Sequence, residues 1–107
     1  MRREDALVLD MLQAAQQAQE FTEKGRAALD DWVSFYAVQH AVQIIGEAAA
    51  QTSAEFRAAH PDLPWSEMIG TRNLIVHGYR DVDPDRLWTT LATCIPQLIP
   101  QLEALLP

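Results

Sequence analysis

The sequence predicts an all-α protein, an up-and-down bundle of four helices that forms a single domain over residues 1–107. Apolar side chains recur at steps of three and four along most of the chain, which is the spacing of one face of an α-helix. The six prolines all follow residue 60 and leave two long stretches without a helix breaker. With 107 residues, 49% of them hydrophobic, the chain can bury one core of modest size.

The first half of the chain is expected to form two helices. The first covers about residues 4–23, and the second covers about residues 31–59. Asp30 or Asp31 can cap the second helix, and Pro61 ends it because the residue before a proline disfavours helical geometry. The apolar face of this helix is wider than a solvated helix needs, which suggests a second copy of the chain as its cover. The side chains that widen it are Trp32, Tyr36, Ile44 and Ala48.

The second half is expected to form two more helices. The third covers about residues 65–78, with Pro64 in its first helical position, and Gly70 inside it suggests the close approach of another backbone. The fourth covers about residues 84–105 and begins at a capping aspartate, Asp83, that is followed by a proline. Two further prolines must kink or break this last helix. They are Pro96 and Pro100.

The charge balance limits the possible functions. The chain has a formal net charge of −7 and a pI of about 4.7, whereas a general nucleic-acid-binding protein is basic because phosphate contacts dominate its affinity. Either RNA is not a partner, or its contact with the protein is local and transient, or a basic partner takes part.

The single cysteine, Cys94, permits no intramolecular disulfide, which fits a cytoplasmic protein, and it excludes zinc sites rich in cysteine. Cys94 is expected to be a small buried residue. The sequence predicts neither a secretion signal nor a membrane-spanning stretch. We expect no metal and no other cofactor.

The segment from Arg72 to Tyr79 carries the candidate chemistry. At about 100° per residue, Tyr79 falls on nearly the same helix face as Arg72, whereas His77 points about 140° away from it. Asn73 lies four residues before His77 and is its neighbour on the helix surface. One helix therefore does not easily aim Arg72 and His77 at one phosphate. Either the helix loosens near Gly78, or two copies of the segment face each other and pool their side chains.

These residue types suffice for RNA cleavage without a metal. Histidine exchanges protons near neutral pH, so His77 can take the proton of a ribose 2′-hydroxyl that attacks the adjacent phosphorus. The planar fork of Arg72 suits the charge that builds on the phosphoryl oxygens. The structural alternatives are an arginine that reaches into solvent, a histidine beside the last carbonyls of its helix, and a tyrosine that packs with its hydroxyl exposed. Glu47 lies in an apolar stretch, and it either pairs with Arg72 or is exposed.

The chain resembles the HepT toxins of the HEPN superfamily, whose motif is Arg, four residues, His, one residue and Tyr. Arg72, His77 and Tyr79 match that motif within the string IGTRNLIVHGY. Three further segments resemble the family's second-helix signature, its connecting loop and its entry to the last helix, so the similarity covers nearly the whole chain. These segments are Ile44-Ile45-Gly46-Glu47-Ala48, His60-Pro61-Asp62-Leu63-Pro64-Trp65, and Asp81-Val82-Asp83 with Leu87-Trp88.

The resemblance implies a dimeric all-α fold with both motifs in a shared cleft, and a metal-independent endoribonuclease activity. It implies that Arg72 stabilises the phosphoryl charge, that His77 is the general acid and base, and that Asn73 orients the phosphate or the ribose. It also implies a toxin whose antitoxin is a minimal nucleotidyltransferase of the MntA type. That antitoxin would transfer AMP from ATP to Tyr79, a candidate substrate contact, and would place bulk and negative charge where an RNA phosphate must sit.

The competing interpretation is a non-catalytic helical dimer that binds a nucleotide or regulates a nucleotidyltransferase. A pure binding module does not need the full Arg–His–Tyr set, so the complete motif favours the enzyme. Intact RNA together with tight nucleotide binding would support the binding module instead.

Overall fold

The computed structural model describes residues 3–107, and all regular structure in that range is helical. The predicted all-α class is therefore confirmed. η1 and η2 are short 3₁₀ helices, and η3 is a π-helical segment. The elements in chain order are α1 (Arg3–Lys24), η1 (Arg26–Asp30), α2 (Trp32–Gln51), α3 (Ala54–Ala59), α4 (Trp65–His77), η2 (Tyr79–Asp81), α5 (Pro84–Thr89), η3 (Thr90–Cys94) and α6 (Ile95–Glu103).

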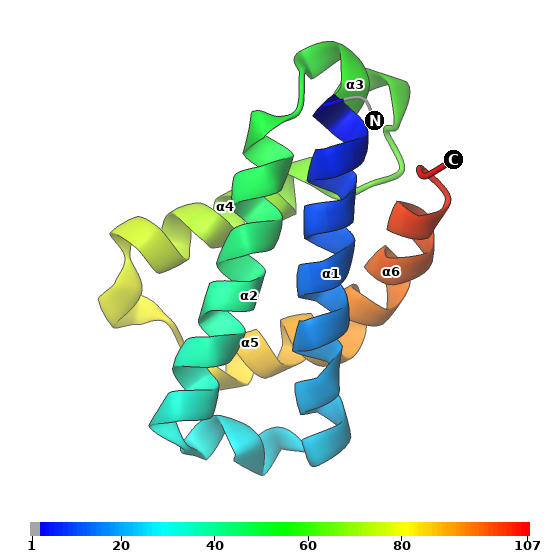
Figure 1. Cartoon of the computed structure of the whole chain (residues 1–107). Coiled ribbons are helices and arrows are strands. Elements are labelled where there is room, and N and C mark those ends of the chain that lie inside the picture. Colours follow the sequence, from blue (N-terminus) through cyan, green and yellow to red (C-terminus); the bar gives the residue numbers. More distant parts are fainter. Residues whose placement is uncertain (1–2) are drawn as a thin grey trace.

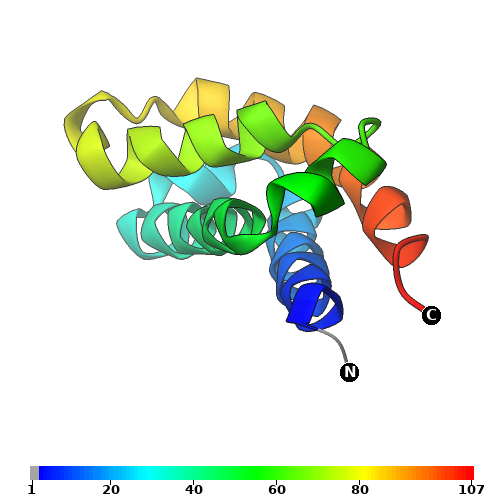
Figure 2. The same cartoon turned by 90° about the horizontal axis from the view of Figure 1, so that it is seen from above.

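The helices form two layers that cross each other (Figures 1 and 2). α1 and α2 lie side by side and run antiparallel in the first layer. α4 crosses α2 steeply, and the chain then returns through α5 in the second layer until α6 packs against α1. α2 is thus packed against both α1 and α4, which brings α2 against the helix that carries the motif.

The core lies between these layers and is built from apolar faces of the long helices. Trp65 is buried as expected, and Trp88 is partly buried against the same core. The largest side chains that are almost completely buried are Met11, Leu91, Leu102, Val8 and Val38. No helix within residues 3–107 is both long and apolar enough to cross a membrane.

The end of the first helix and the start of the second lie close to where the sequence predicts them. α1 ends at Lys24, and Gly25 follows with a φ of 85°, a conformation that glycine adopts without the steric cost of a side chain. Of the two candidate caps for α2, Asp31 is the one used. Its carboxylate accepts hydrogen bonds from the Ser34 backbone N–H at 3.1 Å and from the Ser34 hydroxyl at 3.0 Å.

The prediction of one helix over residues 31–59 is wrong, because that stretch is divided into α2 and α3. Thr52 is extended, and its hydroxyl donates to the Ala49 carbonyl at 2.7 Å. Ser53 then caps α3 by accepting a hydrogen bond from the Phe56 backbone N–H at 3.0 Å. Threonine and serine side chains that form hydrogen bonds with nearby backbone groups compete with the hydrogen bonds of a helix. Thr52 and Ser53 both form such hydrogen bonds, and α2 ends before them. Arg57 completes this end by donating from Nη1 to the Thr52 carbonyl at 2.6 Å.

Two expectations for α4 also need correction. Pro64 precedes the helix as its cap, with a ψ of 64°, instead of occupying the first helical position. Gly70 does not mark a close approach of another backbone in this chain, because nothing lies within 4 Å of the place where its Cβ would stand. The close approach occurs instead at Gly46 on α2, as described below.

The last helix is bent, as its prolines predict. The backbone N–H of Ile95 donates to the Thr90 carbonyl, so the turn before Pro96 is wound with the wider π spacing. Pro100 lies within α6, which continues past it to Glu103. Cys94, expected to be buried, is exposed, because Leu91 and Ile95 take the inward positions around it.

Candidate functional site

The guanidinium of Arg72 is held by two acceptors. Glu47, which projects from α2, accepts from Nε at 2.8 Å through Oε1 and from Nη2 at 3.3 Å through Oε2. Asn73 accepts from Nη1 at 2.6 Å through its side-chain oxygen. Of the two alternatives for Glu47, pairing with Arg72 is the one that the structure contains, and it joins α2 to α4 between residues 25 positions apart in the sequence.

The remaining donors of Arg72 are suited to a phosphate. A guanidinium has five N–H groups, one on Nε and two on each Nη. The three hydrogen bonds to Glu47 and Asn73 use one N–H on each of the three nitrogens. One N–H therefore remains on Nη1 and one on Nη2, which is the number needed to bind two oxygens of one phosphate. The Arg72 side chain keeps 27% of its surface exposed, so an incoming ligand can reach it.

The pairing stabilises the charged form of both partners. The hydrogen bond from Arg72 is the main cause that lowers the pKa of the Glu47 carboxyl, and partial desolvation opposes it. The same bond is the main cause that raises the pKa of Arg72. Glu47 therefore acts as an ionised acceptor at neutral pH, and its negative charge orients the guanidinium without removing its proton.

Arg72 lies on α4 at a point where α2 comes very close. Gly46, the residue before Glu47, is buried on α2. A Cβ built on Gly46 would meet the Arg72 Cβ and would stand 2.6 Å from the Met68 carbonyl oxygen. The spacing of residues in the sequence does not predict a role for Gly46, although its place in a helix interior is a signal, since glycine lowers helix propensity.

His77 is the last residue of α4, and its side chain is exposed. Because α4 is regular from Arg72 to His77, the two side chains diverge by about 140° around the helix. The helix changes only at Gly78, which follows His77, so loosening there does not turn His77 toward Arg72. Asn73 is also exposed and lies one helical turn before His77.

Tyr79 does not lie on α4, so the helical-wheel argument that placed it on the face of Arg72 does not apply. The Gly78 N–H donates to the Leu74 carbonyl at 2.7 Å and closes the helix, and Tyr79 then begins the short 3₁₀ helix η2. The Tyr79 side chain is among the most exposed apolar groups of the described chain, at 65%. It is therefore open to another protein.

Apart from Leu9 on α1, the exposed large apolar side chains of the described residues fall into two groups near the ends of helices. One group stands on the first turns of α2, where the Trp32 and Tyr36 rings meet edge to face at 5.7 Å. The other group lies within the motif segment, at the end of α4 and the start of η2. The two groups are Trp32, Val33 and Tyr36, and Leu74, Val76 and Tyr79. Such exposure is typical of surfaces that another protein covers.

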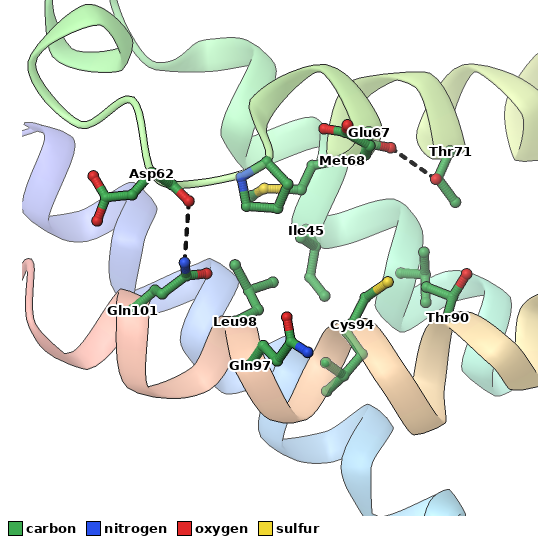
Figure 3. Close-up of a pocket in the computed structure, with 13 residues that line it drawn as sticks. Ile45, Asp62, Glu67, Met68, Thr71, Thr90, Cys94, Gln97, Leu98 and Gln101 are labelled. Atoms are coloured by element: carbon green, nitrogen blue, oxygen red, sulfur yellow. Dashed lines mark hydrogen bonds between the residues drawn. The ribbon is translucent and has the colours of Figure 1, made fainter.

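A hollow lies elsewhere in the described chain, between α4 and the η3–α6 stretch (Figure 3). It has a volume of about 470 Å³ and an apolar floor that includes Ile45, Met68 and Leu98. At its rim Gln101 donates to the Asp62 carbonyl at 3.0 Å, and Glu67 adds a carboxylate. Its lining contains no arginine, lysine or histidine, so it offers no cationic side chain to a phosphate. Within residues 3–107, no three His, Cys, Asp or Glu side chains gather as a metal site would require.

Known proteins resemble this chain over nearly all its length. The family model described as "Ribonuclease HepT-like" matches residues 11–105, a range that includes every candidate site residue. A protein of Methanocaldococcus jannaschii named "Putative RNase MJ1380" is 33% identical over 100 residues, which cover 92% of each chain. A protein of Thermococcus cleftensis named "Probable ribonuclease HepT" is 36% identical over 98 residues, or 90% of this chain and 89% of that protein. No solved structure gives a significant match.

Proposed function

Because the chain belongs to the HepT-like ribonuclease family, we propose that it is a metal-independent endoribonuclease and the toxin of a toxin–antitoxin module. The observation that best supports this proposal is the hydrogen bonding of the Arg72 guanidinium. Its guanidinium is held by Glu47 and Asn73 and keeps one N–H on each Nη nitrogen for a phosphate.

The proposed reaction uses the ribose 2′-hydroxyl as the nucleophile. A neutral His77 takes the hydroxyl proton while the 2′ oxygen bonds to the adjacent phosphorus. The bond from phosphorus to the 5′ oxygen breaks, and a protonated histidine returns a proton to that oxygen. The products are a 2′,3′-cyclic phosphate and a 5′-hydroxyl. Arg72 stabilises the charge on the phosphoryl oxygens, and Asn73 orients the phosphate or the ribose.

The first test is incubation of the purified protein with single-stranded RNA in the presence of EDTA. We expect the RNA to be cut, because every group that the protein supplies to the proposed reaction is an amino-acid side chain. The readout is the pattern of fragments on a denaturing gel. RNA that is cut only after a divalent metal is added would contradict the proposed chemistry, and intact RNA with tight nucleotide binding would support a regulatory module instead.

We further propose that the working enzyme is a homodimer in which each site combines Arg72 of one copy with His77 of the other. The divergence of these side chains on α4 supports this arrangement, because neither copy aims both at one phosphate. The exposed apolar groups at the start of α2 and at the end of α4 supply surface for a second copy.

Mixing two inactive variants tests the shared site. Arg72→Ala and His77→Ala proteins are each expected to be inactive, but a mixed dimer contains one intact site. After co-expression or exchange of subunits, we expect about a quarter of the wild-type activity, since half of the dimers are mixed and each has one site of two. Activity that stays absent in verified mixed dimers would place Arg72 and His77 in the same copy's site.

Tyr79 is proposed as the regulatory residue. A nucleotidyltransferase antitoxin of the MntA type would join the Tyr79 hydroxyl to the α-phosphorus of ATP and release pyrophosphate. The exposure of Tyr79 on η2, two residues after His77, supports access by such an enzyme and explains how the added AMP blocks RNA. With the antitoxin and ATP, we expect mass spectrometry to find one or more adenylyl groups on Tyr79 and loss of RNA cleavage. Adenylylation that persists in Tyr79→Phe, without modification of Tyr79 in the wild type, would refute this assignment.

A further inference from the structure

Gly46 lies where α2 and α4 are in close contact. It is buried in the interior of α2, where its backbone is helical, so no unusual φ requires a glycine there. What requires it is space, because an added Cβ would meet the Arg72 Cβ and lie 2.6 Å from the Met68 carbonyl oxygen. The carbonyl is part of the α4 backbone and cannot rotate away, so a side chain at position 46 must push the two helices apart.

The neighbouring contact makes this spacing important for the site. Glu47 follows Gly46 directly and holds Arg72 through hydrogen bonds of 2.8 Å and 3.3 Å. A hydrogen bond weakens within a few tenths of an ångström beyond such distances. The separation of α2 and α4 at Gly46 therefore decides whether the Glu47 carboxylate can accept hydrogen bonds from both Nε and Nη2 of Arg72.

We propose that Gly46 is a positioning residue of the ribonuclease site, which acts by letting α4 come close enough for Glu47 to orient the Arg72 guanidinium. The effect of Gly46 on RNA cleavage rests on the proposed ribonuclease function. The effect of Gly46 on the orientation of the Arg72 guanidinium does not rest on that function, and it can be measured even if the protein has no activity.

The test compares Gly46→Ala with Gly70→Ala. Both replacements add one methyl group to a helix interior and raise helix propensity equally. They differ in space, because nothing lies within 4 Å of the Cβ position at Gly70. The Arg72 Nε–H signal in a ¹⁵N–¹H spectrum, assigned by its loss in Arg72→Lys, reports the bond to Glu47. We expect this signal to shift or to broaden through solvent exchange in Gly46→Ala and in Glu47→Gln, and to stay in place in Gly70→Ala.

Cleavage of single-stranded RNA gives the second readout. We expect Gly46→Ala to lose activity on the order of 10²-fold, as a catalytic group displaced by about 1 Å does, at temperatures where circular dichroism shows that it is folded. In an Arg72→Lys background, which keeps measurable residual activity, the same replacement is expected to cost no further activity, because the guanidinium through which it acts is gone. A general loss of stability would lower the activity in both backgrounds.

The results separate the two proposals. If wild-type protein does not cut RNA, the ribonuclease proposal fails while the Arg72 signal still tests the role of Gly46. A folded Gly46→Ala protein with an unchanged Arg72 signal overturns that role. If Gly46→Ala is too unstable, the Gly46→Ala/Gly70→Ala double variant is used, because Gly70→Ala strengthens α4. If the double variant does not fold either, Gly46 serves the fold alone and the proposal is overturned.

Discussion

Replacing His77 with alanine is expected to reduce RNA cleavage by about 10²- to 10⁴-fold, the usual contribution of a general acid and base. The expected loss is chemical, because His77 is exposed at the end of α4 and supports no part of the core. The melting temperature and the oligomeric state should stay close to those of the wild type. Single-turnover cleavage of a labelled RNA, with protein in excess, measures the effect on the chemical step directly.

His40→Ala is the matched control for this experiment. His40 is also an exposed histidine in a helix, but it lies on α2 outside the motif. It should keep wild-type activity under the same conditions. A folded His77→Ala protein that cuts RNA at the wild-type rate would show that another group moves the proton, and the proposed role of His77 would have to be abandoned.

Replacing Arg72 with lysine is expected to reduce cleavage by about 10²- to 10³-fold, although the positive charge is kept. Lysine has a single ammonium nitrogen, so it cannot bind Glu47 through two nitrogens and still present a pair of N–H donors to a phosphate. The loss should appear mainly in kcat, because the fork acts on charge that develops in the transition state. Steady-state kinetics on an RNA oligonucleotide separate kcat from KM.

The control for Arg72→Lys is Arg86→Lys, which makes the same exchange at an exposed arginine on α5. Arg86→Lys should leave both kcat and KM unchanged. If Arg72→Lys raised only KM, Arg72 would bind substrate and transition state equally, and its proposed catalytic role would be wrong. If Arg72→Lys did not fold at all, the main role of Arg72 would be structural, namely to join α2 to α4 through its pair with Glu47.

Much of the fold follows from local signals in the sequence. The apolar periodicity and the caps at Asp31 and Asp83 predict where α1, α2 and α5 begin or end, and the structure confirms the use of both caps. The prolines predict the bend of the last helix. The division of α2 from α3 was missed because Thr52 and Ser53 are tolerated in helices, and their bonds to nearby backbone decide the outcome only in context.

The candidate site was predictable in its residue types but only partly in its geometry. The cost of a carboxylate in an apolar stretch makes Arg72 a candidate partner of Glu47 but leaves an exposed Glu47 as the alternative, and the structure contains the pair. The position of Tyr79 was not predictable from helix periodicity, because Gly78 ends α4 first. Gly46 and Gly70 look alike in sequence, and only the crossing of the helices shows which of them needs the space.

The central claim, cleavage through the ribose 2′-hydroxyl, is tested most directly on an RNA oligonucleotide whose cut site has been mapped. The nucleotide on the 5′ side of the cut is replaced by its 2′-deoxy form, and the reaction is run with EDTA. We predict that this single replacement abolishes cleavage at that position, and that the unmodified RNA yields a 2′,3′-cyclic phosphate and a 5′-hydroxyl. Cleavage of the 2′-deoxy RNA, or products that carry a 3′-hydroxyl and a 5′-phosphate, would contradict the proposed mechanism.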